Sequence, residues 1–199
     1  TFGQDMRWRR FVIQQAKLSP GGTLLDLATG TGDIALEAVR AVPNLTAVGG
    51  DFSIGMMLVG QQQRDGDRVK WVGADAIQLP FSNNSFDAVT SGYLMRNVID
   101  IPRALSEQKR VLKPGGRVVV LDTSPPPNHL RYVIPLLGRL ISGNPDAYQY
   151  LPDSTQKFKT PEELATLMRE AGFEMVRYKT FMFGTMAVHW GEKPQKGKP

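Results

Sequence analysis

The sequence predicts an α/β domain built on a doubly wound, mostly parallel sheet. Short apolar runs typical of buried strands alternate with segments whose apolar residues recur at helical spacing. The strand-like runs are residues 23–28, 45–52, 69–75, 86–93 and 117–124. A glycine-rich turn follows the first run, and open sheets of this kind bind ligands beyond the carboxyl ends of their strands. We therefore look for function at that edge.

The expected helices have recognisable ends. They occupy residues 34–42, 53–63, 101–112 and 160–171, after an amphipathic segment at 11–18. Ser53 and Thr160 are residue types that cap helix N-termini, and Pro43 and Gly172 end the first and last of these helices. Asp33 and Ser53 are interpreted as helix caps in preference to ligand contacts.

The C-terminal third departs from the alternating pattern. Prolines are too frequent for one long helix in residues 125–158, which we interpret as a substrate-side insertion of short helices. Residues 173–181 and 185–191 resemble two strands joined by a tight turn, an antiparallel pair at the sheet edge that brings the total to seven strands. The prediction is one domain over residues 1–191 and a basic tail over 192–199.

Composition excludes several classes of function. The chain has 199 residues, 41% of them hydrophobic, which suits one core. No run approaches the roughly 18 apolar residues that span a bilayer, and no signal peptide is evident, so a cytoplasmic protein is expected. With no cysteine and two histidines, neither thiolate chemistry nor a metal site is expected. The net charge of +5 gathers near the termini without an RNA-binding motif, so no nucleic-acid partner is expected.

The glycine turn raises a question about its ligand. Gly30, Gly32 and Ala35 match GxGxxA, a spacing typical of dinucleotide sites. Asp26, however, comes immediately before the turn, and its carboxylate would repel a pyrophosphate. S-adenosylmethionine has no phosphate and carries an ammonium and a sulfonium group. The charge pattern therefore favours S-adenosylmethionine over NAD.

Two further acidic positions support this choice. Asp51 ends the second strand, where its carboxylate could accept hydrogen bonds from ribose hydroxyls, although NAD sites use the same device. Asp75, followed by Ala76, could bind the adenine amino group and a ring nitrogen. Met56 and Met57 leave two readings open, cover for the adenine face or filler for the core.

A family resemblance extends along most of the chain. Similarity to the class I S-adenosylmethionine-dependent methyltransferases is carried by LDLATGTGD, GDFSIGMM, ADAIQLPFSNNSFDAV and RVLKPGGRVVVLD. Similarity to the ubiquinone/menaquinone biosynthesis C-methyltransferases is carried by MRNV, RVLKPGGRVVVLDTS, IPLLGRLISGN, AYQYLPDSTQKF and FGTMAVHWG. The resemblance implies a Rossmann-like fold and a methyltransferase activity.

The resemblance also implies site residues. It places donor contacts at Thr31 and at the acidic positions after the second and third strands, and it aligns Arg96 and Asn97 with an Arg-Asn-Val signature at the active-site edge. Trp8 and Arg9 match the end of an N-terminal signature. The residues expected to contact the donor are Asp26, Ala28, Gly30, Thr31, Gly32, Asp51, Phe52, Met56, Asp75, Ala76 and Ser91.

The chain departs from the family pattern in places. Asp5 stands where the N-terminal signature has histidine, and Asp122 stands where a glutamate is usual. Gly92 occupies the position of an expected serine, with Ser91 one place earlier. Segments before the first residue and near 129–132 are expected to be missing relative to the family.

The implied chemistry is attack by an electron-rich ring carbon on the sulfonium methyl. The ring becomes strongly nucleophilic when a hydroxyl with a pKa near ~10 loses or shares its proton. Arg96 with Asn97 is the hypothesis for stabilising the phenolate, against an alternative in which Arg96 pairs with a loop carboxylate. His189 is interpreted as structural rather than as a base. Tyr148 and Tyr150 could line a ring pocket or an interface.

The function predicted is C-methylation of a prenylated hydroquinone, demethylmenaquinol in preference to a benzoquinol. Two alternatives stay open: O- or N-methylation of another small aromatic molecule, and a non-catalytic donor-binding subunit of a quinone-biosynthesis complex. Residues 132–141, with the basic and apolar segment 7–12, could hold the prenyl tail or rest on the inner face of a membrane. Internal packing or a homodimer contact is the competing interpretation.

Overall fold

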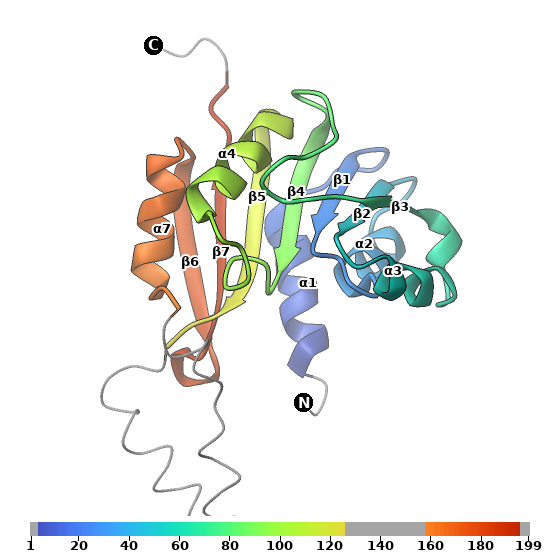
Figure 1. Cartoon of the computed structure of the whole chain (residues 1–199), viewed down its shortest axis with the longest axis horizontal. Helices are drawn as coiled ribbons and strands as arrows, with labels where there is room; N and C mark the ends of the chain where they lie inside the picture. The colour runs from blue at the N-terminus through green and yellow to red at the C-terminus, as the bar shows by residue number, and fades with distance from the viewer. Residues whose placement is uncertain (1–3, 126–157, 196–199) are drawn as a thin grey trace, which may run out of the picture.

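The structure, a computed structural model, describes residues 4–125 and 158–195 (Figure 1). Its centre is a seven-stranded sheet in the order β3-β2-β1-β4-β5-β7-β6. The strands are β1 (Thr23–Leu27), β2 (Thr46–Asp51), β3 (Val69–Gly73), β4 (Phe86–Gly92), β5 (Leu112–Thr123), β6 (Glu174–Phe181) and β7 (Met186–Glu192). The helices are α1 (Gln4–Ala16), α2 (Asp33–Ala41), α3 (Ile54–Gln61), α4 (Ile101–Val111) and α7 (Pro161–Glu170), with 3-10 turns η1 (Gly66–Arg68) and η3 (Met182–Gly184).

Strand directions confirm the predicted architecture. All pairings from β3 to β5 are parallel, and β7 is antiparallel to both β5 and β6. The antiparallel pair therefore lies at the edge as expected, with β7 inside and β6 at the margin. In the register, Asp26 of β1 lies between Gly49 of β2 and Thr90 of β4, near the carboxyl ends of the strands.

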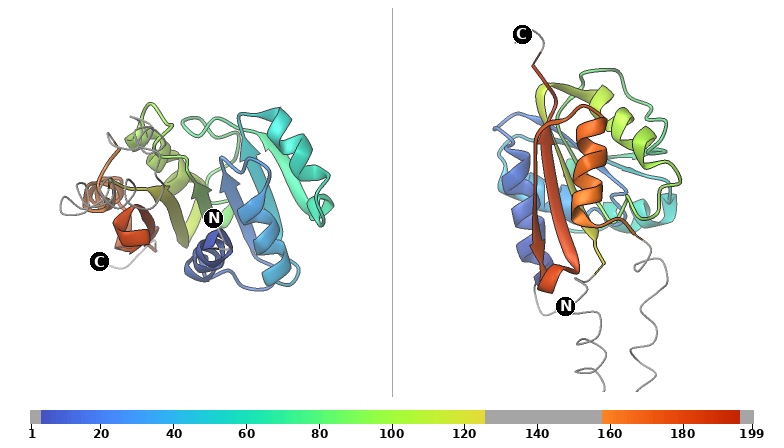
Figure 2. Two further views of the ribbon diagram at one scale, coloured as in Figure 1. Left: turned by 90° about the horizontal axis from the view of Figure 1, so that it is seen from below. Right: turned by 90° about the vertical axis from the view of Figure 1, so that its left-hand side faces the viewer.

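Helices lie on both faces of the sheet, as Figure 2 shows from below, and an apolar core fills the space on each face. Leu24 of β1 belongs to the core beneath α1 and α2, while Leu25 and Leu27 belong to the core beneath α4 and α7. This alternation follows from the period of two along a strand, and burial on both faces explains why the strand sequences are almost continuously apolar. The helices cover the two faces of the sheet, and the carboxyl ends of its strands are where an open sheet of this kind binds ligands.

Two of the three predicted helix caps stand at the N-cap position, and one of them makes the capping hydrogen bond. Thr160 forms a capping box with Glu163, which fixes the start of α7. Ser53 stands at the N-cap of α3, but its hydroxyl makes no capping bond. The interpretation of Asp33 as a cap is wrong, because Gly32 occupies that position and the Asp33 carboxylate binds Arg9 instead.

The start of β5 also differs from the expectation. The strand was predicted to begin at residue 117 after a turn, whereas it begins at Leu112, directly after α4 ends at Val111. An irregularity between the pairs Phe86–Leu112 and Ala88–Arg117 absorbs the extra residues. At Gly116 a Cβ would lie 2.8 Å from the Lys113 carbonyl oxygen, so the glycines here permit a bulge rather than mark a chain break.

Most of the predicted insertion, including residues 132–141, Tyr148 and Tyr150, lies outside the described residues. Across 4–125 and 158–195, no helix is long and apolar enough to cross a bilayer.

Candidate active site

A cavity of about 850 Å³ opens at the carboxyl ends of β1 to β4. Residues from α1 and α3 complete its wall, so segments far apart in the sequence meet there. The predicted site residues that line it are Asp26, Ala28, Gly30, Thr31, Asp51, Phe52, Met56, Asp75, Ala76 and Asn97. Gly32, Ser91 and Arg96 are not among the residues that line it. Ten of the thirteen predicted positions are thus brought to one cavity.

The Asp51 carboxylate organises the glycine turn. Its Oδ2 accepts a hydrogen bond from the Gly30 amide at 2.7 Å, and its Oδ1 accepts one from the Ser53 amide at 2.7 Å. Gly30 and Ala28 have left-handed backbones, with φ of 56° and 52°. A left-handed conformation is costly for alanine, so the surrounding contacts must hold the turn in this shape.

Asp26 is buried beneath the turn, with 1% of its surface exposed. Its two oxygens accept hydrogen bonds from the hydroxyls of Thr29 and Thr90, each at 2.7 Å. Burial outweighs these bonds and raises the pKa of Asp26 to about 6. A cation bound in the cavity would favour the ionised form of this carboxylate and so oppose the effect of burial.

Trp71 of β3 supports the turn from behind, and its role was not anticipated from the sequence. Its indole packs so closely on Gly32 and Gly60 that a Cβ at either position would overlap the ring. Its Nε1 donates to the Gly66 carbonyl oxygen at 2.9 Å. Gly32 itself does not line the cavity, and this packing together with a φ of 88° is sufficient to require glycine there, so its expected contact with the donor stays a prediction.

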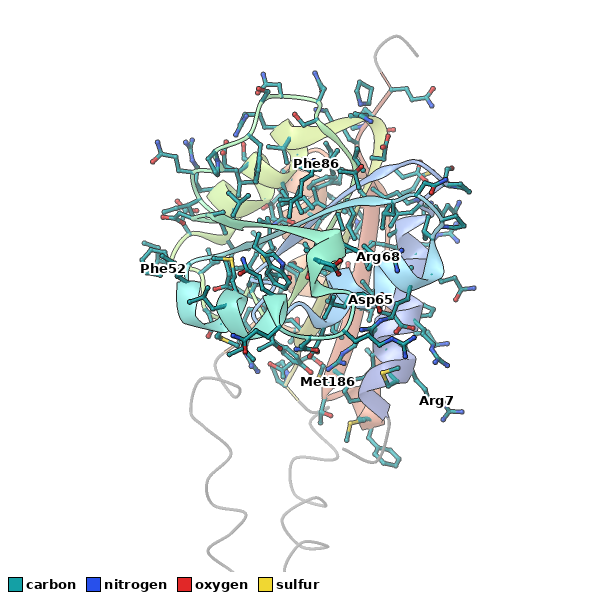
Figure 3. The ribbon with its side chains drawn as sticks, turned by 90° about the vertical axis from the view of Figure 1, so that its right-hand side faces the viewer. Arg7, Phe52, Asp65, Arg68, Phe86 and Met186 are labelled. Carbon is teal, nitrogen blue, oxygen red and sulfur yellow. The ribbon has the colours of Figure 1, made fainter. Side chains whose placement is uncertain are left out.

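The two methionines of α3 have separate roles. Met57 is buried, which makes it core filler, whereas Met56 is half-exposed and lines the cavity. A Cβ on Gly30 would lie 3.0 Å from the Met56 Cε, so glycine at that position leaves room for the thioether. Phe52 projects outward near the cavity rim, with 87% of its surface exposed (Figure 3).

The other end of the cavity is lined mainly by apolar side chains that follow β4. Tyr93 lines it with a φ of 59°, and the Asn97 amide donates to the Tyr93 carbonyl oxygen at 2.8 Å. Leu94, Val98 and Ile99 are the apolar residues of this wall. The strained backbone at Tyr93 is of a kind that clusters at functional sites.

Arg96 turns away from the cavity toward β5. Its guanidinium lies 4.7 Å from the centre of the Tyr93 ring and donates to the Thr123 hydroxyl at 3.3 Å. Its Nε is 3.9 Å from Asp122, a carboxylate that is 1% exposed. An ion pair with a carboxylate was the competing interpretation of Arg96, and it is observed, although the acid belongs to a strand rather than a loop. Burial raises the pKa of Asp122 to about 6.

Comparison with known proteins identifies the chain. The model of the ubiE/COQ5 methyltransferase family matches residues 1–193. The chain belongs to this family. A relative from Desulfotalea psychrophila, named ubiquinone/menaquinone biosynthesis C-methyltransferase UbiE, is 50% identical over 97% of this chain and 82% of its own. A demethylmenaquinone methyltransferase from Thermus thermophilus is 43% identical over 98% of this chain and 93% of its own.

Solved structures of methyltransferases have the same fold as this chain. Phosphoethanolamine N-methyltransferase 2 of Haemonchus contortus, solved with S-adenosyl-L-methionine, superposes with a TM-score of 0.74 at 17% identity, over 95% of this chain and 53% of that one. Family and fold together make the protein an S-adenosylmethionine-dependent methyltransferase, so a non-catalytic subunit is no longer an open alternative.

The cavity fits the methyl donor of the family. The charged residues that line it are Arg9, Asp26, Asp33, Asp51 and Asp75, four acids against one base. Such an excess of carboxylates suits a ligand that carries an ammonium and a sulfonium and has no phosphate. Among the described residues, no group of three or more histidine or acidic side chains could hold a metal ion.

Ser91, an expected donor contact, and His189, interpreted as structural, both lie away from the cavity. Ser91 is fully buried, and because strand residues alternate its side chain faces the opposite side of the sheet from Thr90 and Asp26. Its expected contact with the donor stays a prediction. His189 is 2% exposed, and its Nε2 lies 2.8 Å from the Pro161 carbonyl oxygen. Burial lowers the pKa of His189 to about 4, which supports the structural interpretation.

Trp8 and Arg9, which match the end of the N-terminal family signature, both line the cavity, a position that the sequence does not predict. The amphipathic character of α1 was the available signal. Trp8 is 5% exposed in the core shared with α2, and Arg9 is the next residue of the same helix.

Proposed function

We propose that this protein transfers a methyl group from S-adenosylmethionine to a ring carbon of a prenylated hydroquinone, demethylmenaquinol in preference to a benzoquinol. The observation that carries the proposal is the polarity of the cavity, with acids around the glycine turn and apolar side chains beyond Tyr93. The names of the relatives from Desulfotalea psychrophila and Thermus thermophilus supply the substrate class. A flat aromatic ring with a hydrocarbon tail suits such an apolar end.

The donor is proposed to lie across the strand ends in the order of the sheet. Asp75 and Ala76, after β3, would take the adenine, with Phe52 and Met56 covering its faces. Asp51, at the end of β2, would take the ribose. The amino-acid end of the donor would then lie over the glycine turn, which includes Ala28 and Thr31. The carboxylate of Asp26 would there offset the positive charge of the donor. All three residues line the cavity.

The proposed reaction forms one carbon–carbon bond and breaks one carbon–sulfur bond. A ring carbon attacks the sulfonium methyl, the electron pair of the broken bond stays on sulfur, and the ring carbon then loses its proton to restore aromaticity. S-adenosylmethionine supplies an already activated methyl group, so the protein contributes mainly alignment and exclusion of water. A hydroquinone hydroxyl must also give up or share its proton, because the phenolate is the stronger nucleophile.

Arg96 is proposed to stabilise that phenolate from behind Tyr93, with Asn97 orienting the ring. Arginine is a poor proton acceptor, since its pKa exceeds about 12. Its charge lies 4.7 Å from the centre of the Tyr93 ring, and Asp122 holds the guanidinium in place. From this position Arg96 would act through its electric field, which is weaker than a direct hydrogen bond to the reacting oxygen.

A membrane contact is proposed for the rim of the cavity. Residues 52–63 contain no charged side chain, and Ile54, Leu58 and Val59 expose 65%, 53% and 55% of their surfaces on α3. Ile99, on the cavity wall, is 92% exposed. We propose that this apolar rim rests on the inner face of the cytoplasmic membrane, in which a prenylated substrate is dissolved. A homodimer through the same rim is the competing possibility.

The deciding experiment is incubation of methyl-labelled S-adenosylmethionine with demethylmenaquinol and, separately, with a demethyl benzoquinol. The expected product is menaquinol labelled on a ring carbon. Label on oxygen would favour the alternative of O-methylation, and label on neither acceptor would overturn the substrate class.

A further inference from the structure

One positively charged side chain lies among the acids that line the cavity. Its only cationic side chain among the described residues is Arg9, against four carboxylates. An acidic cavity attracts the ammonium and sulfonium groups of the donor but repels the carboxylate of the same molecule. The donor's carboxylate therefore needs a positive partner, and Arg9 is the described residue able to supply one.

Arg9 stands at the appropriate end of the cavity. Its helix, α1, packs on α2, β4 and β5, whereas Asp75 follows β3 on the other side of the sheet order. A donor with its adenine at Asp75 and its ribose at Asp51 extends over β1 toward β4. Its amino-acid end then points to the side where α1 closes the cavity.

The guanidinium is oriented and retains hydrogen-bonding capacity. Its Nη2 donates to the Asp33 Oδ2 at 2.6 Å, and the Arg9 side chain is 25% exposed. A guanidinium has five N–H donors in a fixed plane and can bind two carboxylates at once. Asp33, which starts α2 beside the glycine turn, thus fixes the direction in which Arg9 presents its remaining donors.

We infer that Arg9 binds the α-carboxylate of S-adenosylmethionine, with Asp33 as its positioning residue. The inference rests on the donor and on the orientation given in the proposed function, and it is independent of the methyl acceptor. It gives α1 a part in donor recognition, in addition to its packing on the sheet.

The test compares S-adenosylmethionine with its decarboxylated form, which keeps the adenosine, sulfonium and ammonium groups. Dissociation constants are measured by calorimetry without an acceptor, for the wild type and for Arg9→Ala. A charge-assisted hydrogen bond is expected to change the ratio of the two affinities by about 10-fold or more in favour of the decarboxylated donor. Because no acceptor is present, a failure of the quinol assignment leaves this result unaffected.

Arg10→Ala is the matched control. Arg10 also joins α1 to α2, through Glu37 at 3.2 Å, but it does not line the cavity. The affinity ratio should be unchanged in this variant. If Arg9→Ala weakens both donors equally, or leaves the ratio at the wild-type value, the inference is overturned and Arg9 is a packing residue. Arg9→Gln, which removes the charge but keeps the first part of the aliphatic stem, provides the same comparison if the alanine variant is unstable.

Discussion

Burial and the positive charge of the donor shift the pKa of Asp26 in opposite directions. Burial favours the protonated acid and raises its pKa to about 6, whereas a bound cation favours the carboxylate. The affinity for S-adenosylmethionine should therefore fall about tenfold for each pH unit below 6. Asp26→Asn should bind the donor more weakly at pH 7 and lose this pH dependence. Calorimetry between pH 5 and 7.5 measures both, and a pH dependence that persists in the variant would contradict the assignment.

Arg96 tests whether a charge outside the cavity wall contributes to catalysis. Arg96→Ala should lower kcat by about 10-fold, less than the roughly 100-fold or more that is typical of losing a donor in direct contact with developing negative charge. The dissociation constant of the donor should not change, because Arg96 is not among the residues that line the cavity. Arg177→Ala, which removes an exposed arginine of β6, is the control. Turnover unchanged in Arg96→Ala would reject the proposed role.

At the scale of elements, the glycine turn depends on the indole of β3. Gly32→Ala places a Cβ against Trp71 at a residue with a φ of 88°, so both strain and overlap oppose it. The melting temperature should fall and the KM for the donor should rise, because the turn must move. Gly55→Ala is the control, since a Cβ there meets nothing within 4 Å. It should be neutral or slightly stabilising in α3. Similar effects of the two substitutions would argue against the indole support.

The apolar face of α3 can be tested in the same way. Leu58→Gln combined with Val59→Gln should reduce flotation with vesicles of anionic lipid, because these exposed side chains supply apolar area without supporting the core. Met175→Gln replaces a residue that is 62% exposed at the start of β6, near the opposite edge of the sheet, and should leave flotation unchanged. If the wild type does not float and instead sediments as a dimer that these α3 substitutions dissociate, the rim is a subunit interface.

For the whole molecule, the sheet was predictable because each buried strand is a continuous apolar run between turn residues. The donor cavity was predictable because parallel strands end at one edge, so that acids far apart in the sequence, such as Asp26 and Asp75, meet there. Contacts between residues of different strands and helices were harder to predict from the sequence. The partner of Arg96, the face occupied by Ser91 and the packing of Trp71 on two glycines depend on tertiary register, which local patterns do not contain.

Global stability should reflect three buried titratable groups that act in opposite directions. Asp26 and Asp122 have folded pKa values raised to about 6, so their contribution to stability is complete below the ordinary aspartate pKa and is lost as the pH rises through 6. His189 has a folded pKa lowered to about 4 from 6.5, so it costs stability as the pH falls between these values. His189→Gln should therefore lose less stability than the wild type between pH 7 and 4.5. Both aspartates are present in both proteins, so the difference between their urea unfolding free energies isolates the histidine. A difference that does not change with pH would mean that the imidazole of His189 remains free to protonate in the folded protein.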